Sequence, residues 1–396
     1  MNVARHPGPM DPAPGPEHSL GLETDHGRVP LGYVQVGGQV YLVARHRSAM
    51  WPVDILRPGK ATLQLPGGAR RRGSAQLVID PADQARILEL FRSKYGDEGF
   101  TRWYAHPARI IQVDLSADDA AGDATSYGRW IESEFDSIAD DYDRHILGNR
   151  VNRLLRDRSL AHLRVVFRDR HRLLEVGCGS GMETLQLLRD GHEITAVDIS
   201  ERMLEVVRRK ATAEGLVERL RCVHLRARDL DQLPQGGDVG TFDGAYSTYG
   251  AMNCEPDLRP TVRALASILR PGTPFVAGVY NRWCLFEFAG YLLALQPERA
   301  VGRAHNPVRV GASRFCVDVF AFSAPEFRRL FAPEFRVAEV EGVPVTIPPS
   351  DLTGYVERLS SHFSTWARWD ASIGRRWPAK YLGDHFLMTF VRSPVG

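Results

Sequence analysis

The feature that most constrains this chain is a pair of apolar runs joined by a glycine-rich loop. Residues 173–176 form the first run, the loop 177–181 has glycine at every second position, and the second run, 194–197, ends at Asp198. Glycine permits a positive φ and lets a ligand approach the backbone without a Cβ in the way. An acid 21 residues after the first loop glycine is where a nucleotide-binding β-α-β unit presents a carboxylate to ribose hydroxyls. The pattern therefore predicts a nucleotide-binding β-α-β unit.

The glycine spacing argues against a dinucleotide. A dinucleotide site follows G-x-G-x-x-G, in which the third glycine lets the helix pack close to the pyrophosphate. Here Gly181 comes one place early, and Met182 fills the expected position. Glu175, just before the loop, would repel a diphosphate and suits a cationic amino-acid ligand better.

The segment 175–181, Glu-Val-Gly-Cys-Gly-Ser-Gly, resembles the first motif of the class I S-adenosylmethionine-dependent methyltransferases. The resemblance covers about 135–392. Further segments resemble, in order, the helix before the first strand, the adenine-contacting turn, the fourth strand and the turn before strand five; they are 135–143, 226–230, 242–247 and 269–272.

This resemblance implies an α/β fold, in which a doubly wound, Rossmann-like sheet has seven strands and the last strand is antiparallel. Residues 335–340 and 385–391 are the candidates for the closing pair of strands. The implied cofactor is S-adenosyl-L-methionine, with Asp198 on the ribose, Asp229 on the adenine amine, and Tyr142 closing over the cofactor. The cofactor-binding residues implied in this way are Tyr142, Glu175, Gly177, Cys178, Gly179, Gly181, Asp198, Ile199, Met203, Asp229, Leu230 and Ser247.

Two of these residues have a second interpretation. Asp198 could act as a cap, because Ser200 and Glu201 open the next predicted helix. Met203 stands at helical spacing with the apolar residues of that helix, so it fits the core as well as the adenine pocket.

Composition limits the classes of protein that this chain can belong to. A chain of 396 residues exceeds what one core usually supports, so two domains are expected, and a net charge of +2 favours neither a nucleic-acid nor a membrane partner. The five scattered cysteines show no C-x-x-C spacing, which predicts reduced thiols and no metal site. No apolar run reaches the ~20 residues that span a bilayer. We expect a cytoplasmic protein. We also expect a bacterial one, because 46 of the 50 basic residues are arginine and such a bias is typical of a GC-rich bacterial genome.

The N-terminal part of the chain is predicted to form a tail followed by a small β-rich domain. Residues 1–27 carry five prolines and little apolar periodicity, so they are predicted to be a disordered tail. Short strands follow between 40 and 115. A helix is predicted to open at Asp80-Pro81, to bury a stripe that includes Ile87 and Phe91, and to end at Gly96.

The order of elements over 28–120 resembles the deazaflavin-dependent nitroreductase-like members of the split β-barrel family. Trp51 and the hairpin over 60–79 are among the matching features. That family usually has a longer basic loop that grips the flavin phosphate, and only 24–28 remains of it here. A cofactor-less barrel that scaffolds the enzyme or mediates homodimer contacts is therefore favoured over one that binds a flavin or deazaflavin.

The remainder, 121–396, is predicted to be the methyltransferase domain with an acceptor pocket near 246–253. Two aromatic insertions, about 281–314 and 344–383, are predicted to cover that pocket. Such a pocket suits a flat or hydrophobic small molecule better than tRNA, DNA or a basic peptide.

Catalytic residues are less visible than cofactor residues, because methyl transfer needs a general base only when the acceptor starts protonated. The candidates are Tyr249, Asn253 and His385, with His145 as a further candidate base. Asp384 precedes His385, but adjacent strand residues point to opposite faces, so no direct pairing is expected.

The leading hypothesis is methyl transfer from S-adenosylmethionine to an O, N, C or S atom of a small-molecule acceptor from secondary metabolism. One alternative is a bifunctional protein whose front domain also uses a flavin or deazaflavin for redox chemistry. The other is a non-catalytic, nucleotide-binding scaffold.

Overall fold

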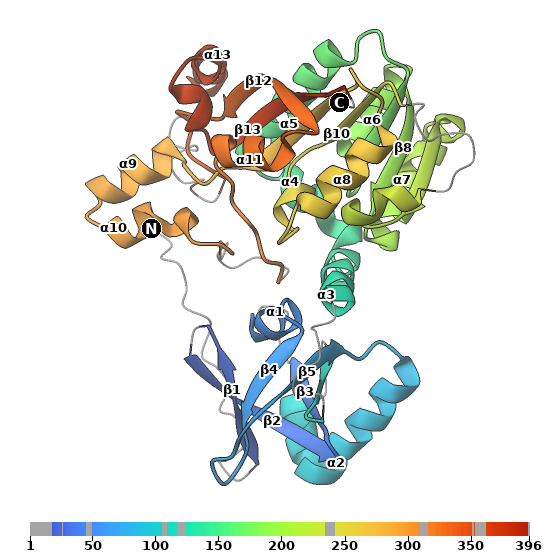
Figure 1. The fold of residues 1–396 in the computed structure, drawn as a ribbon, viewed down its shortest axis with the longest axis vertical. Coiled ribbons are helices and arrows are strands. Elements are labelled where there is room, and N and C mark those ends of the chain that lie inside the picture. Colours follow the sequence, from blue (N-terminus) through green and yellow to red (C-terminus); the bar gives the residue numbers. More distant parts are fainter. Residues whose placement is uncertain are drawn as a thin grey trace. The chain divides into compact units, whose positions relative to one another are not determined.

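The computed structural model describes residues 18–25, 27–44, 50–104, 109–116, 124–233, 242–308, 316–350, 352 and 362–394. They form two compact units, shown with the course of the chain in Figure 1. The division falls between Glu134 and Phe135, about one helix later than the predicted boundary, and the short segment before Asp318 belongs to the first unit.

The first unit is a closed barrel with strand order β1-β2-β3-β6-β5-β4 (Figure 1). Its strands are β1 (Ser19–Thr24), β2 (Gly27–Val36), β3 (Gln39–Ala44), β4 (Lys60–Gln64), β5 (Arg70–Leu77) and β6 (Arg109–Asp114). Its helices are α1 (Trp51–Leu56), α2 (Pro81–Tyr104) and α3 (Ala124–Asp136), and the last two residues of α3 belong to the second unit. All neighbouring strands are antiparallel, and pairing of β1 with β4 closes the barrel.

One prediction for this unit was wrong in part. The predicted tail contains β1, whose Leu20 and Leu22 are buried in the barrel, so order begins before residue 28; residues 1–17 lie outside the described part. The predicted helix end at Gly96 is confirmed, because this residue has a non-helical backbone with a φ of 71°. Gly96 separates the helix that opens at Pro81 from a second helical stretch, which runs to Tyr104 within α2. The predicted burial of Ile87 and Phe91 is confirmed.

The second unit contains a seven-stranded sheet with order β12-β13-β11-β10-β7-β8-β9. Its strands are β7 (Arg172–Val176), β8 (Glu193–Asp198), β9 (Leu220–His224), β10 (Gly244–Ser247), β11 (Pro274–Tyr280), β12 (Phe335–Val343) and β13 (His385–Arg392). The strands from β9 to β11 are parallel, whereas β13 is antiparallel to both β11 and β12. The predicted α/β fold with an antiparallel last strand is confirmed.

Helices cover both faces of this sheet (Figure 1). The α-helices are α4 (Tyr142–Leu147), α5 (Arg150–Val166), α6 (Met182–Arg189), α7 (Glu201–Ala213), α8 (Arg259–Ile268), α9 (Leu285–Leu293), α10 (Pro297–Ala300), α11 (Ala324–Phe331) and α13 (Phe363–Gly374). Short 3-10 turns are η1 (Ala139–Asp141), η2 (Val217–Arg219), η3 (Ala227–Gln232), η4 (Ala251–Asn253), η5 (Gly302–Ala304) and η7 (Ala379–Tyr381).

Consecutive residues of a strand pack into two separate hydrophobic cores, one on each face of the sheet. Leu174 and Phe275 pack with α8 and α11 on one face, whereas Leu173 and Val276 pack with α5, α6 and α7 on the other. This is the alternation that strand geometry imposes, and it explains why the central strands read as continuous apolar runs. Among the described residues, no helix is long and apolar enough to cross a membrane.

The strand order reverses between β7 and β10, because β8 and β9 lie on one side of β7 and the later strands lie on the other. In open parallel sheets, ligands bind beyond the carboxyl ends of the strands at such a reversal. The glycine loop follows β7, so it stands at this position.

Candidate functional site

The glycine loop has the backbone that its composition predicts. Gly177, Gly179 and Gly181 have φ of 74°, 51° and 78°, a region that residues with a Cβ rarely adopt. A Cβ on Gly177 would also lie 2.2 Å from the Cβ of Ala251. The loop is anchored to β8, since the Gly177 N–H donates to the Val197 carbonyl over 2.7 Å.

Asp198 fixes the same loop through its side chain. One carboxylate oxygen accepts from the Gly179 N–H (2.7 Å) and the other from the Ser200 N–H (2.9 Å). Ser200, rather than Asp198, is the N-cap of α7. Burial raises the pKa of Asp198 to about 6, although both backbone donors oppose that rise. Each oxygen keeps a further lone pair, so the carboxylate can still accept from a ribose diol.

Glu175 lies beneath the loop and is 1% exposed. One of its oxygens accepts from the Thr184 hydroxyl and from the Tyr246 hydroxyl, the latter over 2.9 Å. Burial raises the pKa of Glu175 to about 8. A buried carboxyl of this kind gains most from a cation placed beside it.

Two further charged residues, of which the sequence analysis missed Arg156, lie near the loop. The Arg156 guanidinium of α5 holds both oxygens of Glu183, at 3.0 and 2.8 Å, and Glu183 stands in the first turn of α6. Burial raises the pKa of Tyr142, and the charges of Arg156, Glu183 and Asp198 all act on its hydroxyl. Tyr142 also approaches the loop at Gly179. No sequence pattern pointed to Arg156, because arginines are common throughout this chain.

The predicted adenine residues follow β8 and β9. Asp229 lies in η3 and is half-buried, and its carboxylate accepts no hydrogen bond from any residue that the structure describes; Leu230 behind it is fully buried. The Ile199 carbonyl faces the His224 ring nitrogen at 2.8 Å. Met203 packs in a small cluster with partly buried Tyr142, which fits its interpretation as a core residue.

The acceptor candidates follow β10. Ser247 ends that strand and is buried, and Tyr249 follows with a φ of 48°, which is rare for a residue with a side chain. The Tyr249 hydroxyl donates to the Leu155 carbonyl over 2.7 Å, and Arg156 lies 5.1 Å from the ring centre.

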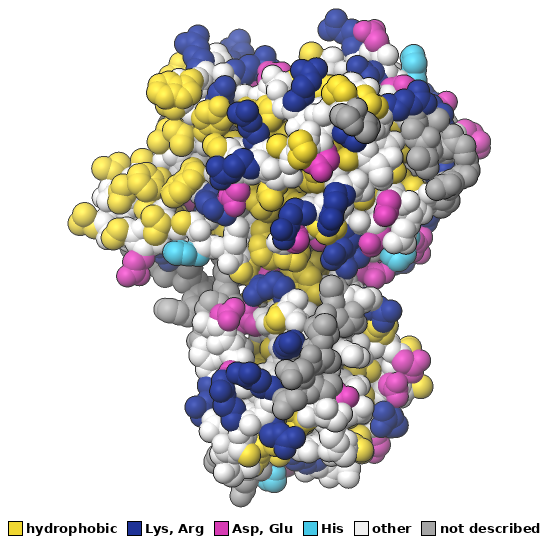
Figure 2. Space-filling model, viewed as in Figure 1, with side chains coloured by type: hydrophobic (Ala, Val, Ile, Leu, Met, Phe, Trp, Pro, Cys, Tyr) yellow, Lys and Arg dark blue, Asp and Glu magenta, His cyan; other side chains and the backbone are white. Residues whose placement is uncertain are grey.

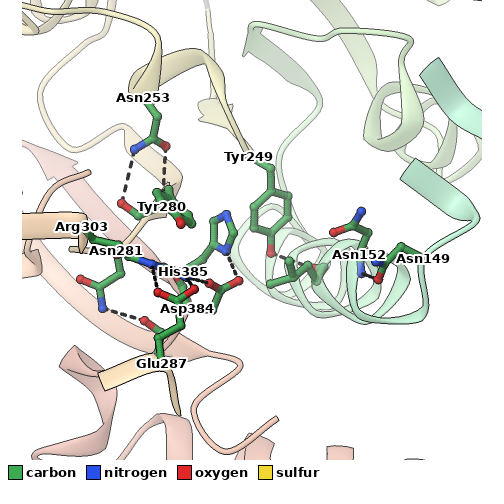
Figure 3. A network of polar contacts seen from close by, with 12 residues as sticks. Asn149, Asn152, Tyr249, Asn253, Tyr280, Asn281, Glu287, Arg303, Asp384 and His385 are labelled. Atoms are coloured by element: carbon green, nitrogen blue, oxygen red, sulfur yellow. Dashed lines mark hydrogen bonds and ion pairs between the residues drawn. The ribbon is translucent and has the colours of Figure 1, made fainter. Parts of the chain in front are cut away.

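Asn253 has a structural use in this arrangement. Its amide nitrogen donates to the Phe320 carbonyl over 2.7 Å, and its oxygen accepts from the Tyr280 N–H over 3.0 Å. The side chain thus holds the end of β11 against a segment about forty residues further on. Figure 3 shows it pointing at Tyr280.

The expectation that Asp384 and His385 do not pair was wrong. The His385 Nδ1 lies 3.0 Å from an Asp384 oxygen (Figure 3). The alternation of faces holds inside a regular strand, but β13 begins only at His385, so Asp384 precedes it. The other Asp384 oxygen pairs with Arg303 over 2.7 Å. The imidazole lies between two tyrosine rings, with its centre 5.3 Å from Tyr249 and 5.2 Å from Tyr280.

Comparison with known proteins agrees with this geometry. Residues 173–272, which run from β7 to the turn before β11, match the family model for a methyltransferase domain. The second unit thus contains a methyltransferase domain, matched over residues 173–272.

Curated relatives match parts of the chain. The malonyl-[acyl-carrier protein] O-methyltransferase of Halorhodospira halophila is 32% identical over 193 residues, 48% of this chain and 61% of that protein. A ubiquinone biosynthesis O-methyltransferase of Methylocella silvestris is 33% identical over 32% of this chain and 51% of its own. The tRNA 5-carboxymethoxyuridine methyltransferase of Escherichia coli is 26% identical over 38% and 57%. The chain thus spans between half and two thirds of these relatives.

A solved structure of the 1,6-didemethyltoxoflavin-N1-methyltransferase of Burkholderia thailandensis also resembles the chain. It contains 1,6-didemethyltoxoflavin and S-adenosylhomocysteine. The two chains are 19% identical, the match covers 70% of this chain and 93% of that one, and the TM-score is 0.43.

Arg303 is the site residue of the methyltransferase domain that the sequence analysis missed most clearly. It stands in η5 inside the first predicted insertion and is 6% exposed. Its guanidinium pairs with Asp384, bonds Glu287 of α9 over 2.7 Å, and lies 4.1 Å from the ring centre of Tyr280. More than eighty residues separate Arg303 from Asp384 in the sequence, so no local pattern predicts their contact.

The insertions of the methyltransferase domain contain exposed apolar residues. Helix α9 buries none of its residues, and Figure 2 shows a gathering of apolar side chains over it. In the second insertion, Phe363 is buried and Trp369 is 57% exposed, while Tyr355 lies outside the described residues. The covering role of these segments stays a prediction. His145 is exposed on α4.

One group of potential metal ligands lies elsewhere in the methyltransferase domain. His162, Glu339 and Glu341 have ligand atoms within 4.8 Å of one another. Glu341 already pairs with Arg158 and Arg375, and the His162 Nε2 lies 2.7 Å from the Thr389 hydroxyl. The two guanidinium groups already balance the Glu341 carboxylate.

Proposed function

We propose that the chain transfers a methyl group from S-adenosylmethionine to a small-molecule acceptor of secondary metabolism. The observation that carries this proposal is the junction of Asp198 with Gly179. It joins an acid at the end of β8 to a loop of three positive-φ glycines, within a segment that matches a methyltransferase domain. This contact holds the Asp198 carboxylate, which accepts hydrogen bonds, next to the backbone of the loop glycines, which carry no Cβ.

The residues present fit such a cofactor along its length. Asp198 offers its remaining lone pairs to the ribose, and the half-buried Asp229 offers a carboxylate to the adenine amine. Glu175 offers a buried carboxyl that becomes negative when the α-ammonium lies beside it, because a neighbouring cation lowers its raised pKa of about 8. Arg156 offers a cation for the α-carboxylate, beside Tyr142. The sulfonium supplies an electrophilic methyl group.

The acceptor is proposed to lie over the ends of β10 and β11 and the start of β13. Tyr249, Tyr280 and His385 meet there, and aromatic rings around few polar groups are typical of a small-molecule site. Among the candidate catalytic residues, the Tyr249 hydroxyl already donates to a backbone carbonyl and the Asn253 amide holds backbone. His145 is exposed on α4, which leaves His385. Asn253 is then a positioning residue for β11.

Radiolabelled transfer tests this proposal. The full chain is incubated with methyl-labelled S-adenosylmethionine, a small-molecule extract of the source cells, tRNA and total protein, and the fractions are then separated. Label is expected in the small-molecule fraction, and Glu175→Gln is expected to lower its amount while Glu205→Gln, an exposed control, leaves it unchanged. Label confined to tRNA or protein would contradict a small-molecule acceptor, and an absence of transfer would contradict the activity.

A further inference from the structure

We propose that the acceptor atom is the oxygen of a hydroxyl group, and that His385 removes its proton while Asp384 and Arg303 hold the imidazole in place. This inference rests on the proposed methyl transfer and specifies its nucleophile. It is carried by the polar chain Glu287–Arg303–Asp384–His385 shown in Figure 3.

Asp384 sets the tautomer of His385. Asp384 is 2% exposed and faces Nδ1, so the proton of a neutral imidazole stays on Nδ1, where the carboxylate accepts it. Nε2 is then the basic nitrogen. Figure 3 shows this nitrogen pointing away from Asp384, and it has no hydrogen-bond partner among the described residues. A base aimed at the acceptor position is therefore available.

Asp384 carries a negative charge in this arrangement. Burial alone would raise the pKa of this carboxyl, but Arg303 and His385 outweigh burial and hold it well below its usual value. Asp384 is thus an anion when His385 takes up a proton, and it stabilises the imidazolium that forms. Arg303 in turn is held by Glu287 and by the carbonyls of Asn281 and Asp384, both at 3.1 Å.

The charged groups around the acceptor discriminate between possible nucleophiles. The groups facing His385 are Asp384 before its own strand, Tyr280 from β11 and Tyr249 after β10. A guanidinium lies against each tyrosine ring, Arg303 on Tyr280 and Arg156 on Tyr249. Carboxylates already pair with both cations, Arg303 with Glu287 and Asp384, and Arg156 with Glu183. Burying a charged ammonium in this lining without a free partner is costly, which favours an acceptor that is neutral before it loses its proton. A hydroxyl is such a group, and unlike a thiol it is hardly ionised at neutral pH without a base.

The reaction balances with these groups alone. The hydroxyl proton passes to Nε2 of His385, and the oxygen lone pair forms the bond to the methyl carbon. The bond from methyl to sulfur breaks and its electron pair stays on sulfur, which leaves neutral S-adenosylhomocysteine and a methyl ether. His385 then returns the proton to solvent.

The nature of the methylated atom tests this inference directly. The full chain is incubated with S-adenosylmethionine carrying a ¹³C-methyl group and the same small-molecule extract, and the product is examined by carbon NMR, which distinguishes methyl on oxygen, nitrogen, sulfur and carbon. A methoxy signal is expected. Methyl on nitrogen, sulfur or carbon would overturn the hydroxyl assignment while leaving the proposed function intact. No labelled product would overturn both.

Variants then test the roles of the residues, with the acceptor isolated from that product. His385→Gln is expected to lower kcat by about 10²- to 10⁴-fold, as loss of a general base does, with unchanged affinity for S-adenosylhomocysteine. Its rate should recover as rising pH ionises the hydroxyl. His171→Gln, on an exposed residue, is the control. A His385→Gln rate within about threefold of the wild type would overturn the base assignment.

Arg303 is a positioning residue, so its variants need a separate readout. Arg303→Met is expected to lower kcat with little change in the KM for S-adenosylmethionine, and Arg303→Lys to restore part of it, because lysine keeps the charge next to Asp384. Equal losses of kcat in both variants, or a loss that follows the stability of the protein, would show that Arg303 only supports the fold.

Discussion

At the scale of single residues, the buried carboxyl of Glu175 links stability to pH. Its pKa of about 8 in the folded protein, caused first by burial, exceeds the ordinary value of 4.5, so the folded state binds its proton more tightly than the unfolded state does. Stability therefore falls as pH rises from about 4.5 to 8. Asp198, with a pKa of about 6, acts with the same sign between 3.8 and 6.

We predict that the free energy of unfolding falls by a few kcal/mol between pH 5 and 8, and that Glu175→Gln removes most of this fall above pH 6. Urea unfolding at four pH values measures it, with the exposed Glu205→Gln as control. If the free energy of unfolding depends on pH equally in the wild type and in Glu175→Gln, this carboxyl is ionised in the free protein.

A second residue prediction concerns the loop. Gly177→Ala adds a Cβ at a φ of 74° and within 2.2 Å of another Cβ, whereas Gly215→Ala meets a similar φ of 69° with nothing within 4 Å. Both variants incur a strain of about 1–2 kcal/mol, but only Gly177→Ala must also displace Ala251. Denaturant unfolding should show the larger loss for Gly177→Ala. Equal losses would mean that the loop yields to the added group.

At the scale of elements, α11 is held by stacked phenylalanines. Phe331 is fully buried and its ring lies 4.4 Å from that of Phe390 on β13, nearly parallel to it. Phe331→Ala should cost about 3–5 kcal/mol of stability, as core phenylalanine truncations do. Phe288→Ala on the exposed face of α9 should cost well under 1 kcal/mol. Thermal unfolding of both variants checks the contrast, which fails if the losses are similar.

The elements also show how far the sequence predicts this fold. The β7–loop–β8 unit was predictable because glycines, apolar runs and the acid lie within 30 residues. Strand β1 was missed because Ser19–Thr24 is short and follows a proline-rich stretch, and because its order comes from pairing with β2 and β4. The contact between Asp384 and Arg303 was invisible for a related reason, since it depends on the fold rather than on local pattern.

At the scale of the whole molecule, each of the two units has its own core. We predict that the full chain unfolds in two calorimetric transitions and that S-adenosylhomocysteine shifts only one of them. At 100 times the dissociation constant, a ligand adds about 2.7 kcal/mol to the unit that binds it. A single transition, or two that shift together, would show that the units unfold as one.

We propose that Asp198 and the glycine loop together hold the sugar and amino-acid parts of S-adenosylmethionine. Titration calorimetry with S-adenosylhomocysteine tests it most directly, on the wild type, Asp198→Ala and the exposed control Asp257→Ala. We expect binding by the wild type and the control, and an affinity lower by at least about tenfold in Asp198→Ala, because hydrogen bonds to a carboxylate contribute about 1.5–3 kcal/mol each. An absence of heat with the wild type, or equal affinity in Asp198→Ala, would contradict it.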